Sequence, residues 1–284
     1  MFIAALAASL AAAALQTAAP APAGPVLHRY DAPALSPDGR RIATVDSSSV
    51  IGGGGPPAHG VVTIRSNSGE ISATADPCPA CRYGDTAWSP DSGTLAFIAS
   101  DAKAGTATLY VLENDRDLYK PRIVTTVTGL AAHPRWSADG RTIALLAVPN
   151  PHKLVGATQA GAAQTGEIGV ASAIDEQRIA TVPLSGGDLT LVSPPDTWVY
   201  EFDWAPDGGF VATAAKGDGD NNWWTAKLEA FGLDGSERVI AAPKMQMNFP
   251  RVAPDGKSVL FIGGLMSDFG SVGGDIYSLS LIHI

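Results

Sequence analysis

A short phrase occurs five times along the 284-residue chain, and it constrains the fold more than any other feature. Every copy ends in Asp-Gly or Asp-Ser-Gly, four of the five carry Pro before the Asp, and a short apolar segment follows. Pro suits the second position of a type I turn, Asp tolerates the third, and Gly accepts the positive φ that returns the chain to a strand. Each copy therefore predicts a β-hairpin. The turn positions, with the Trp that precedes three of them, are Asp38, Gly39, Trp88, Asp91, Trp136, Asp139, Gly140, Trp204, Asp207, Gly208, Asp255 and Gly256.

The strand after each turn is expected to be covered on both faces. Residues 143–146 and 259–262 are apolar at every position. A strand with one wet face would alternate apolar and polar residues. Small antiparallel sheets stacked face to face would cover both faces of such strands.

The spacing of the copies defines the repeating unit. Successive copies lie 53, 48, 68 and 48 residues apart. Repeats of about 40–50 residues with four strands each are typical of propeller blades. The sequence thus predicts an all-β fold, a β-propeller of four-stranded antiparallel blades with about five blades present. The longest gap holds residues 149–177, rich in Gly, Ala and Gln, where we expect a loop. A β-sandwich with chance turns is the alternative, and five copies in register disfavour it.

The N-terminus has the pattern of an export signal. Residues 1–15 contain no charged side chain and form an apolar run shorter than the roughly 20 residues that span a bilayer. Small residues follow, with Ala21-Pro22-Ala23 as a formal cleavage site. We therefore expect residues 1–23 to be a signal peptide, residues 24–278 to form a partial propeller, and the protein to be exported, periplasmic or extracellular, with no membrane span once the signal is removed. An Ala-rich helix in the mature fold is the alternative.

Residues 279–284 (LSLIHI) have the sequence that a widely used transposase sequencing adapter encodes. We expect this tail to derive from such an adapter and the natural sequence to end near Ser278. Segments added by fusion do not belong to the natural fold. A genuine β-strand is the alternative.

Charge and cysteine content exclude several classes of function. The chain has 28 acidic and 19 basic residues, a net charge of −9, so a nucleic-acid partner is not expected, because phosphate binding needs clustered Lys and Arg. Two cysteines cannot complete a four-thiolate metal site. In an oxidising compartment, Cys78 and Cys81 are expected to form a local disulfide, with free thiols or a metal or redox role as alternatives.

Other candidate sites are weaker. Residues 218–222 resemble the start of a calcium loop, but Trp223 replaces the glycine of the sharp bend, and residues 223–231 look like a strand that carries Glu229 away. The three repeated tryptophans are expected to pack between blades rather than bind ligand. The histidines do not recur in repeat register, which argues against a ring of metal ligands at a propeller axis: His28, His59, His133, His152 and His283. No cofactor, metal or catalytic residue is predicted.

The repeat WSPDG followed by an apolar strand resembles the TolB-type propeller repeat. The segments RYDAPALSPDGRRIATVDS, NWWTAKLEAFGLDG and GGDIYSL resemble the N-terminal propeller of prolyl oligopeptidase-family serine peptidases, including the dipeptidyl and acylaminoacyl branches. This resemblance implies a propeller that admits short peptides to a C-terminal α/β-hydrolase domain with a Ser-His-Asp triad. The G-x-S-x-G elbow of such a domain occurs nowhere in the 284 residues.

These features predict a substrate-gating propeller portion of an exported serine peptidase, inactive by itself because the partner hydrolase domain is missing. The ring is expected to be incomplete, with an apolar patch over residues 259–262 of the fifth blade. A TolB-like, non-enzymatic interaction propeller is the main alternative. A propeller hydrolase or lactonase with an axial metal is a third.

Overall fold

The computed structural model describes residues 24–51, 58–115, 118–151, 175–217, 219–242, 244–264 and 273–281. The expected signal peptide, most of the expected loop over 149–177, and residues 282–284 of the expected adapter tail lie outside these ranges. The strands are β1 (Val26–Leu35), β2 (Arg41–Val50), β3 (Val61–Ser66), β4 (Ile71–Ala75), β5 (Arg82–Trp88), β6 (Thr94–Asp101), β7 (Thr106–Asp115), β8 (Leu118–Trp136), β9 (Thr142–Pro149), β10 (Arg178–Pro183), β11 (Thr190–Leu191), β12 (Thr197–Trp204), β13 (Phe210–Lys216), β14 (Lys227–Phe231), β15 (Glu237–Ala241), β16 (Gln246–Val252), β17 (Ser258–Gly264) and β18 (Asp275–Ser280). Two short helical turns, α1 (Gly219–Asn222) and η1 (Trp223–Thr225), precede β14.

The strands form five antiparallel blades. Blade one is β1-β2-β3-β4, blade four is β12-β13-β14-β15, and blade five has three described strands, β16-β17-β18. Blades two and three share one seven-stranded sheet because β8 runs through both. Its residues 118–128 pair with β7 and its residues 129–136 pair with β9. The predicted all-β propeller of four-stranded blades is confirmed.

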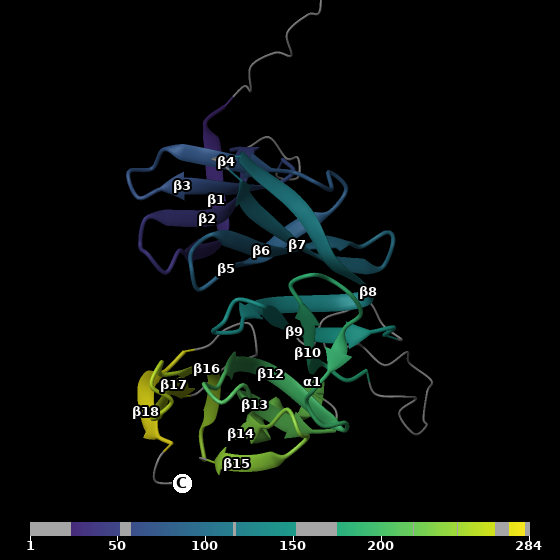
Figure 1. The fold of residues 1–284 in the computed structure, drawn as a ribbon, viewed down its shortest axis with the longest axis vertical. Helices are drawn as coiled ribbons and strands as arrows, with labels where there is room; N and C mark the ends of the chain where they lie inside the picture. The colour runs from purple at the N-terminus through teal and green to yellow at the C-terminus, as the bar shows by residue number, and fades with distance from the viewer. Residues whose placement is uncertain are drawn as a thin grey trace, which may run out of the picture.

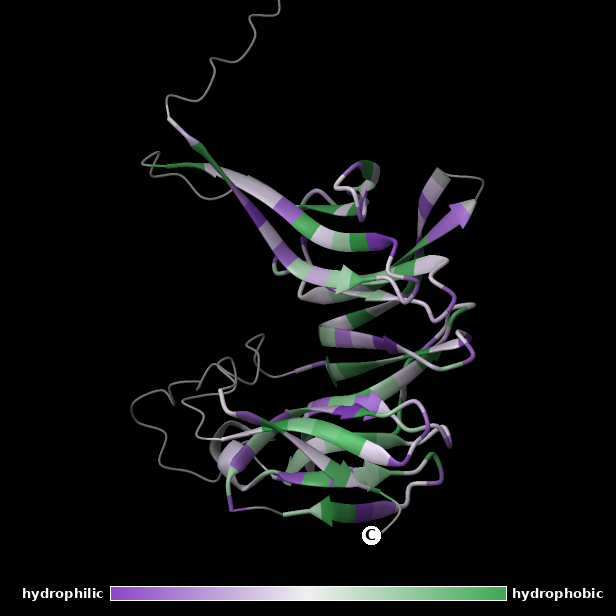
Figure 2. Cartoon of the chain, turned by 90° about the vertical axis from the view of Figure 1, so that its left-hand side faces the viewer, coloured by the Kyte–Doolittle hydropathy of each residue, from purple (hydrophilic) through white to green (hydrophobic). Residues whose placement is uncertain are grey.

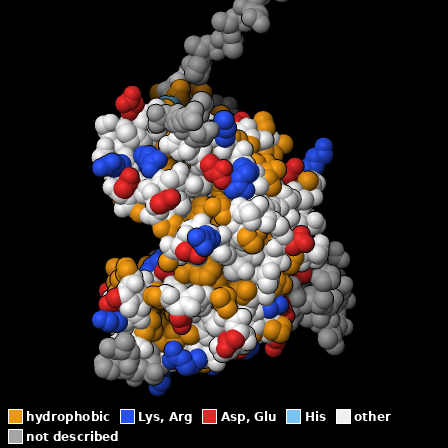
Figure 3. Space-filling model, in the orientation of Figure 1, with side chains coloured by type: hydrophobic (Ala, Val, Ile, Leu, Met, Phe, Trp, Pro, Cys, Tyr) orange, Lys and Arg blue, Asp and Glu red, His pale blue; other side chains and the backbone are white. Residues whose placement is uncertain are grey.

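The blades follow one another around an open arc (Figure 1). The first strands of successive blades (β1, β5, the second part of β8, β12 and β16) contact one another, so they lie at the narrow centre of the arc. We call them the inner strands. The space-filling view shows a notch between the lobe of blade one and the lobe of blades four and five (Figure 3).

Hydrophobic layers lie between neighbouring blades. One layer joins Val62 and Ile64 of blade one to Leu95 and Phe97 of blade two. The alternate residues of β6, Ala96 and Ile98, pack in the next layer against blade three. This is why the strands after the turns are apolar at both parities: each of these sheets is covered on two sides.

Blade five departs from the expected patch over residues 259–262. Val259 and Phe261 are buried in the layer shared with blade four. Leu260 is 45% exposed, and Ile276 on the neighbouring β18 is 76% exposed. The expectation was therefore wrong for half of these positions. Successive side chains of a strand point to opposite faces, and only the face away from blade four lacks a neighbour.

Tryptophan side chains tie successive inner strands together. Trp88 Nε1 donates to the Ala34 carbonyl at 3.1 Å. Trp136 Nε1 donates to the Ala87 carbonyl, and Trp204 Nε1 donates to the Arg135 carbonyl, each at 3.0 Å. In each case the acceptor residue comes immediately before the residue of the previous blade that is equivalent to the donating Trp. Blade five has Val252 at this position, and its backbone N–H instead donates to Asp203 Oδ2 at 2.9 Å.

The five repeated turns connect each inner strand to the second strand of its blade, at one end of the inner strands. In the first turn, Asp38 Oδ1 accepts hydrogen bonds from Ser36 Oγ and from the Arg40 N–H, and Gly39 has φ +69°. At the opposite ends of the inner strands, the second strand of each blade connects to the third, and the connections after β2, β9, β13 and β17 are longer than the repeated turns. There the ribbon of β1 and β2 also runs out beyond the rest of blade one (Figure 2). Among the described residues, no helix has the length and apolar character needed to cross a membrane.

Candidate functional site

Each inner strand contains a β-bulge near its middle. The register shifts fall between Asp31/Ala34, Gly84/Ala87, Ala132/Arg135, Val199/Glu201 and Asn248/Arg251. Bulges re-aim side chains and are frequent beside functional sites. The five repeats share a position three residues before the Trp or its equivalent, and we call it the axial position. Its occupants are Ala32, Asp85, His133, Glu201 and Phe249.

Ionisable residues occupy the axial position in three consecutive blades. Asp85 comes from β5, His133 from β8 and Glu201 from β12. They line one cavity of about 270 Å³, which we call the axial pocket. Thr86, Ala87, Pro134 and Arg135 complete its lining.

Glu201 is the electrostatic centre of the axial pocket. Its side chain is only 3% exposed. Its Oε1 accepts hydrogen bonds from Arg135 Nη2 and from the Phe202 N–H, both at 3.1 Å. Its Oε2 forms an ion pair with His133 Nδ1 at 3.1 Å. On the other side of the imidazole, His133 Nε2 lies 3.8 Å from Asp85 Oδ1. The ring of His133 thus lies between carboxylates of the two neighbouring blades.

These contacts shift the pKa values of Glu201 and His133. Burial raises the pKa of Glu201, but its close contact with His133 and the charges of His133, Arg135 and Arg251 outweigh burial and lower that pKa to about 2. Burial lowers the pKa of His133, but the close contact with the charged Glu201 and the charge of Asp85 outweigh burial and raise that pKa. The arrangement therefore favours an ionised Glu201 beside an imidazolium.

The lining of the axial pocket offers charged side chains and one hydroxyl that is already engaged. Its one hydroxyl, on Thr86, donates to the Ala32 carbonyl at 2.6 Å. Within the described ranges, His, Cys, Asp and Glu side chains form no group of three or more that could hold a metal ion. The charged side chains of the pocket can attract, orient and hold charged groups of a ligand.

Sequence reasoning missed the axial pocket because it compared histidines only with one another. His133 has no histidine at the same position in the other repeats, but it has Asp85 before it and Glu201 after it. Aligning the five copies on the Trp position and reading the residue three places earlier would have shown this mixed ionisable set.

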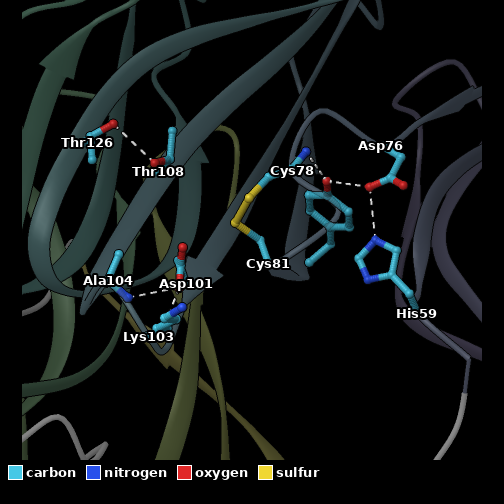
Figure 4. Close-up of a disulfide and its surroundings, with 10 residues drawn as sticks. His59, Asp76, Cys78, Cys81, Asp101, Lys103, Ala104, Thr108 and Thr126 are labelled. Carbon is cyan, nitrogen blue, oxygen red and sulfur yellow. Dashed lines mark hydrogen bonds and ion pairs between the residues drawn. A yellow bond between two sulfur atoms is a disulfide. The ribbon is translucent and has the colours of Figure 1, made fainter.

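The predicted cysteine pair lies elsewhere, in the connection between β4 and β5. Cys78 and Cys81 are joined by a disulfide, with their Cα atoms 5.3 Å apart (Figure 4). The Tyr83 hydroxyl accepts from the Cys78 N–H at 2.6 Å and donates to Asp76 Oδ1 at 2.8 Å. That same carboxylate oxygen lies 2.9 Å from His59 Nε2. The disulfide therefore belongs to a loop that polar side chains also hold.

The other candidates do not gather into a site. The repeated turn residues lie one set per blade, at the end of each inner strand. In the segment compared with a calcium loop, Asp218 lies outside the described residues and Trp223 begins η1. The strand expected over 223–231 covers only Lys227–Phe231, with Glu229 buried within it.

No family model and no curated protein matches the sequence. Solved structures do match the fold. A TolB protein from Agrobacterium tumefaciens superposes with a TM-score of 0.55 at 17% identity, over 89% of this chain and 82% of that chain. The β-propeller domain of the trilobed protease from Pyrococcus furiosus gives a TM-score of 0.57 at 11% identity, over 89% and 69%.

A third similar structure is the acylaminoacyl peptidase from Pyrococcus horikoshii, with a TM-score of 0.53 at 12% identity. The match covers 83% of this chain but only 35% of that chain, so this chain spans about a third of the length of that peptidase. In fold, the chain is a β-propeller similar to TolB propellers and to the propeller domains of peptidases.

Proposed function

We propose that this chain is the substrate-gating β-propeller portion of an exported serine peptidase related to prolyl oligopeptidases. The observation that carries the proposal is the axial pocket. Three successive blades place Asp85, His133 and Glu201 around one cavity, and its lining supplies charged groups that can hold a ligand. A propeller of this kind admits and holds short peptides, while the Ser, His and Asp of an α/β-hydrolase domain, carried on sequence outside this chain, perform the hydrolysis.

Fold similarity supports the proposal at the level of the domain. The acylaminoacyl peptidase from Pyrococcus horikoshii matches this chain over about a third of its own length, as expected if this chain corresponds to one domain of such a protein. The motif resemblance described above points the same way, and the apolar N-terminal run supports export.

A TolB-like interaction propeller without chemistry is the second candidate. The observation that favours it is coverage, because the match spans 82% of the TolB protein from Agrobacterium tumefaciens. In that case the axial pocket would hold a segment of a protein partner instead of a substrate.

The genomic DNA after codon 278 separates the two candidates. For a peptidase, we expect the reading frame to continue into a G-x-S-x-G elbow followed by Asp and then His. A stop codon after no more than one further blade would favour the interaction propeller. The purified 284-residue chain should not hydrolyse peptide p-nitroanilides, and hydrolysis that copurifies with the chain would contradict the proposal.

A further inference from the structure

Asp85 is the acidic group of the axial pocket that remains open to a ligand. Both carboxylate oxygens of Glu201 are engaged, by Arg135 and the Phe202 N–H on one side and by His133 on the other. Asp85 Oδ1 lies 3.8 Å from His133 Nε2, which is an ion-pair distance but longer than a hydrogen bond. The Asp85 side chain is 35% exposed and lines the cavity.

Strained backbone conformations hold the Asp85 carboxylate and the His133 imidazole in place. Asp85 has φ +52° and His133 has φ +53°, in the left-handed region that residues other than glycine rarely adopt. Such strain persists only where surrounding structure imposes it, and here the bulges of two neighbouring inner strands impose it. The two side chains therefore face each other across the boundary between blades two and three.

The charges around His133 come from four inner strands. Asp85 lies on β5, Arg135 on β8 itself and Glu201 on β12, while Arg251 on β16 adds positive charge beside Glu201. Arg135 pairs with Glu201 at 3.1 Å, so those two charges largely cancel. When His133 is protonated, its charge offsets Asp85. When His133 is neutral, Asp85 loses its nearest positively charged neighbour and faces the cavity without it.

We propose that the Asp85 carboxylate binds an alkylammonium group of a ligand. When no ligand is bound, the protonated imidazole of His133 supplies the positive charge opposite Asp85. The ligand's ammonium and the imidazolium then compete for one carboxylate. The inference rests on the proposed function only in treating the centre of the arc as the place where ligands enter. It adds the charge class of the ligand and its regulation by pH.

Competition has a reciprocal signature. If a proton on His133 weakens cation binding, a bound cation must lower the pKa of His133 by the same free energy. Each unit of that shift corresponds to about a tenfold change in affinity between the two protonation states. Binding should therefore strengthen as the pH rises through the titration of His133. A site built on a carboxylate alone would show no such dependence above the pKa of that carboxylate.

Two ammonium probes and one neutral probe test the proposal by NMR titration of the full chain. Nα-acetyl-lysine amide carries only a side-chain ammonium, glycinamide carries only an amino terminus, and Nα-acetyl-norleucine amide carries neither. We expect at least one ammonium probe to bind more tightly at pH 8 than at pH 5 and to lower the pKa of His133, with affinities expressed per protonated probe molecule because an amino terminus titrates at about pH 8. The neutral probe should do neither, and the ranking of the two ammonium probes identifies the source of the charge.

Asp85→Asn is the decisive variant, because Asn tolerates the left-handed backbone and keeps the size of the side chain. It should abolish ammonium binding and the coupled shift of His133. Asp196→Asn is the matched control, since Asp196 is also an aspartate with positive φ (+55°) but is exposed and does not line the pocket. His133→Gln should retain binding and lose its pH dependence.

Equal binding to wild type and Asp85→Asn, equal binding of the neutral probe, or absence of binding by both ammonium probes would each overturn the proposal. These outcomes are distinct from failure of the proposed function. The genomic sequence decides whether a hydrolase domain follows, and probe binding requires no hydrolysis.

Discussion

At the scale of single residues, Glu201 organises the inner strands of blades three and four. Its buried carboxylate pairs with Arg135 and His133, so Glu201→Gln would remove the anion that these two cationic groups share. Breaking a buried pair by removing one partner costs about 3–5 kcal/mol, and the lower end applies here because Arg135 and His133 are partly exposed. We expect a loss of this order in the free energy of unfolding at pH 6, measured by urea denaturation. A loss within error would show that the cluster contributes little to stability.

The same pair predicts how stability depends on pH. Glu201 has its pKa lowered from 4.5 to about 2, so its contribution is full above pH 4.5 and is lost as the pH falls toward 2. His133 has its pKa raised above 6.5, so its contribution is full below pH 6.5 and is lost as the pH rises through the folded-state value. The contribution of the pair is therefore largest between pH 4.5 and 6.5. Subtracting the curve of the Glu201→Gln variant from that of wild type isolates it.

For Glu229, in contrast to Glu201, we expect removal of the charge to stabilise the fold. It is buried in β14, and its Oε2 has no hydrogen-bond partner among the described residues. Burial, with a smaller effect of Glu237, raises its pKa, so the ionised form destabilises the fold above that value. Glu229→Gln should raise the urea midpoint at pH 8. The difference from wild type should shrink as the pH falls below 4.5, where the carboxyl is neutral in both the folded and unfolded chains. A lower midpoint for the variant at pH 8 would contradict this.

Individual residues of the axial pocket were beyond prediction from residue type alone. The turn residues share one chemistry in every repeat, since every copy needs the same backbone angles. Asp85, His133 and Glu201 share only a position, since each blade contributes a different group to one cavity. Their pairing depends on bulges in separate inner strands, which local sequence patterns do not specify.

At the scale of strands and turns, the tie between blades four and five differs from the others. Asp203 Oδ2 accepts the Val252 N–H, where earlier blades use an indole and a carbonyl. Asp203→Ala should weaken this attachment by about 1.5–3 kcal/mol, the contribution of a hydrogen bond to a charged group. Faster amide exchange of Val252, with little change in blade one, is the expected result. Asp203→Asn keeps an acceptor oxygen, so its Val252 amide should exchange at a rate between those of wild type and Asp203→Ala.

The loop between β4 and β5 offers a test of the disulfide. Closing a loop of about four residues stabilises a fold by about 2 kcal/mol in the chain-entropy account. The double variant Cys78→Ser/Cys81→Ser should lose about this much while keeping its fold, because Tyr83 also bonds both to Cys78 and to Asp76. Tyr83→Phe in that background should loosen the loop further. Thiol labelling of native wild type should find no free cysteine.

The hairpins were predictable and the sheet boundaries were not. Turn chemistry and spacing alone locate the five hairpins. Nothing in residues 118–136 signals that one strand serves two blades, since Gly129, where its pairing changes from β7 to β9, is an ordinary glycine in sequence. Its φ of +126° becomes evident only in the structure.

At the scale of the whole molecule, the flank of blade five that faces away from blade four exposes apolar side chains to solvent. Leu260 and Ile276 project from neighbouring strands, away from the layer shared with blade four. Exposed apolar strands promote association. The double variant Leu260→Lys/Ile276→Lys should shift the chain toward monomer in sedimentation velocity and leave its urea midpoint nearly unchanged. Equal association of the variant and wild type would show that a different surface drives association.

Continuity of β8 has a mechanical consequence. A load applied across blades two and three would pass along one unbroken backbone and seven hydrogen-bonded strands, whereas elsewhere it would meet a loop between separate sheets. Those two blades should therefore yield to force together, as a single rupture event. The arc would then behave as a stiff middle section with more compliant arms, which could swing toward or away from each other.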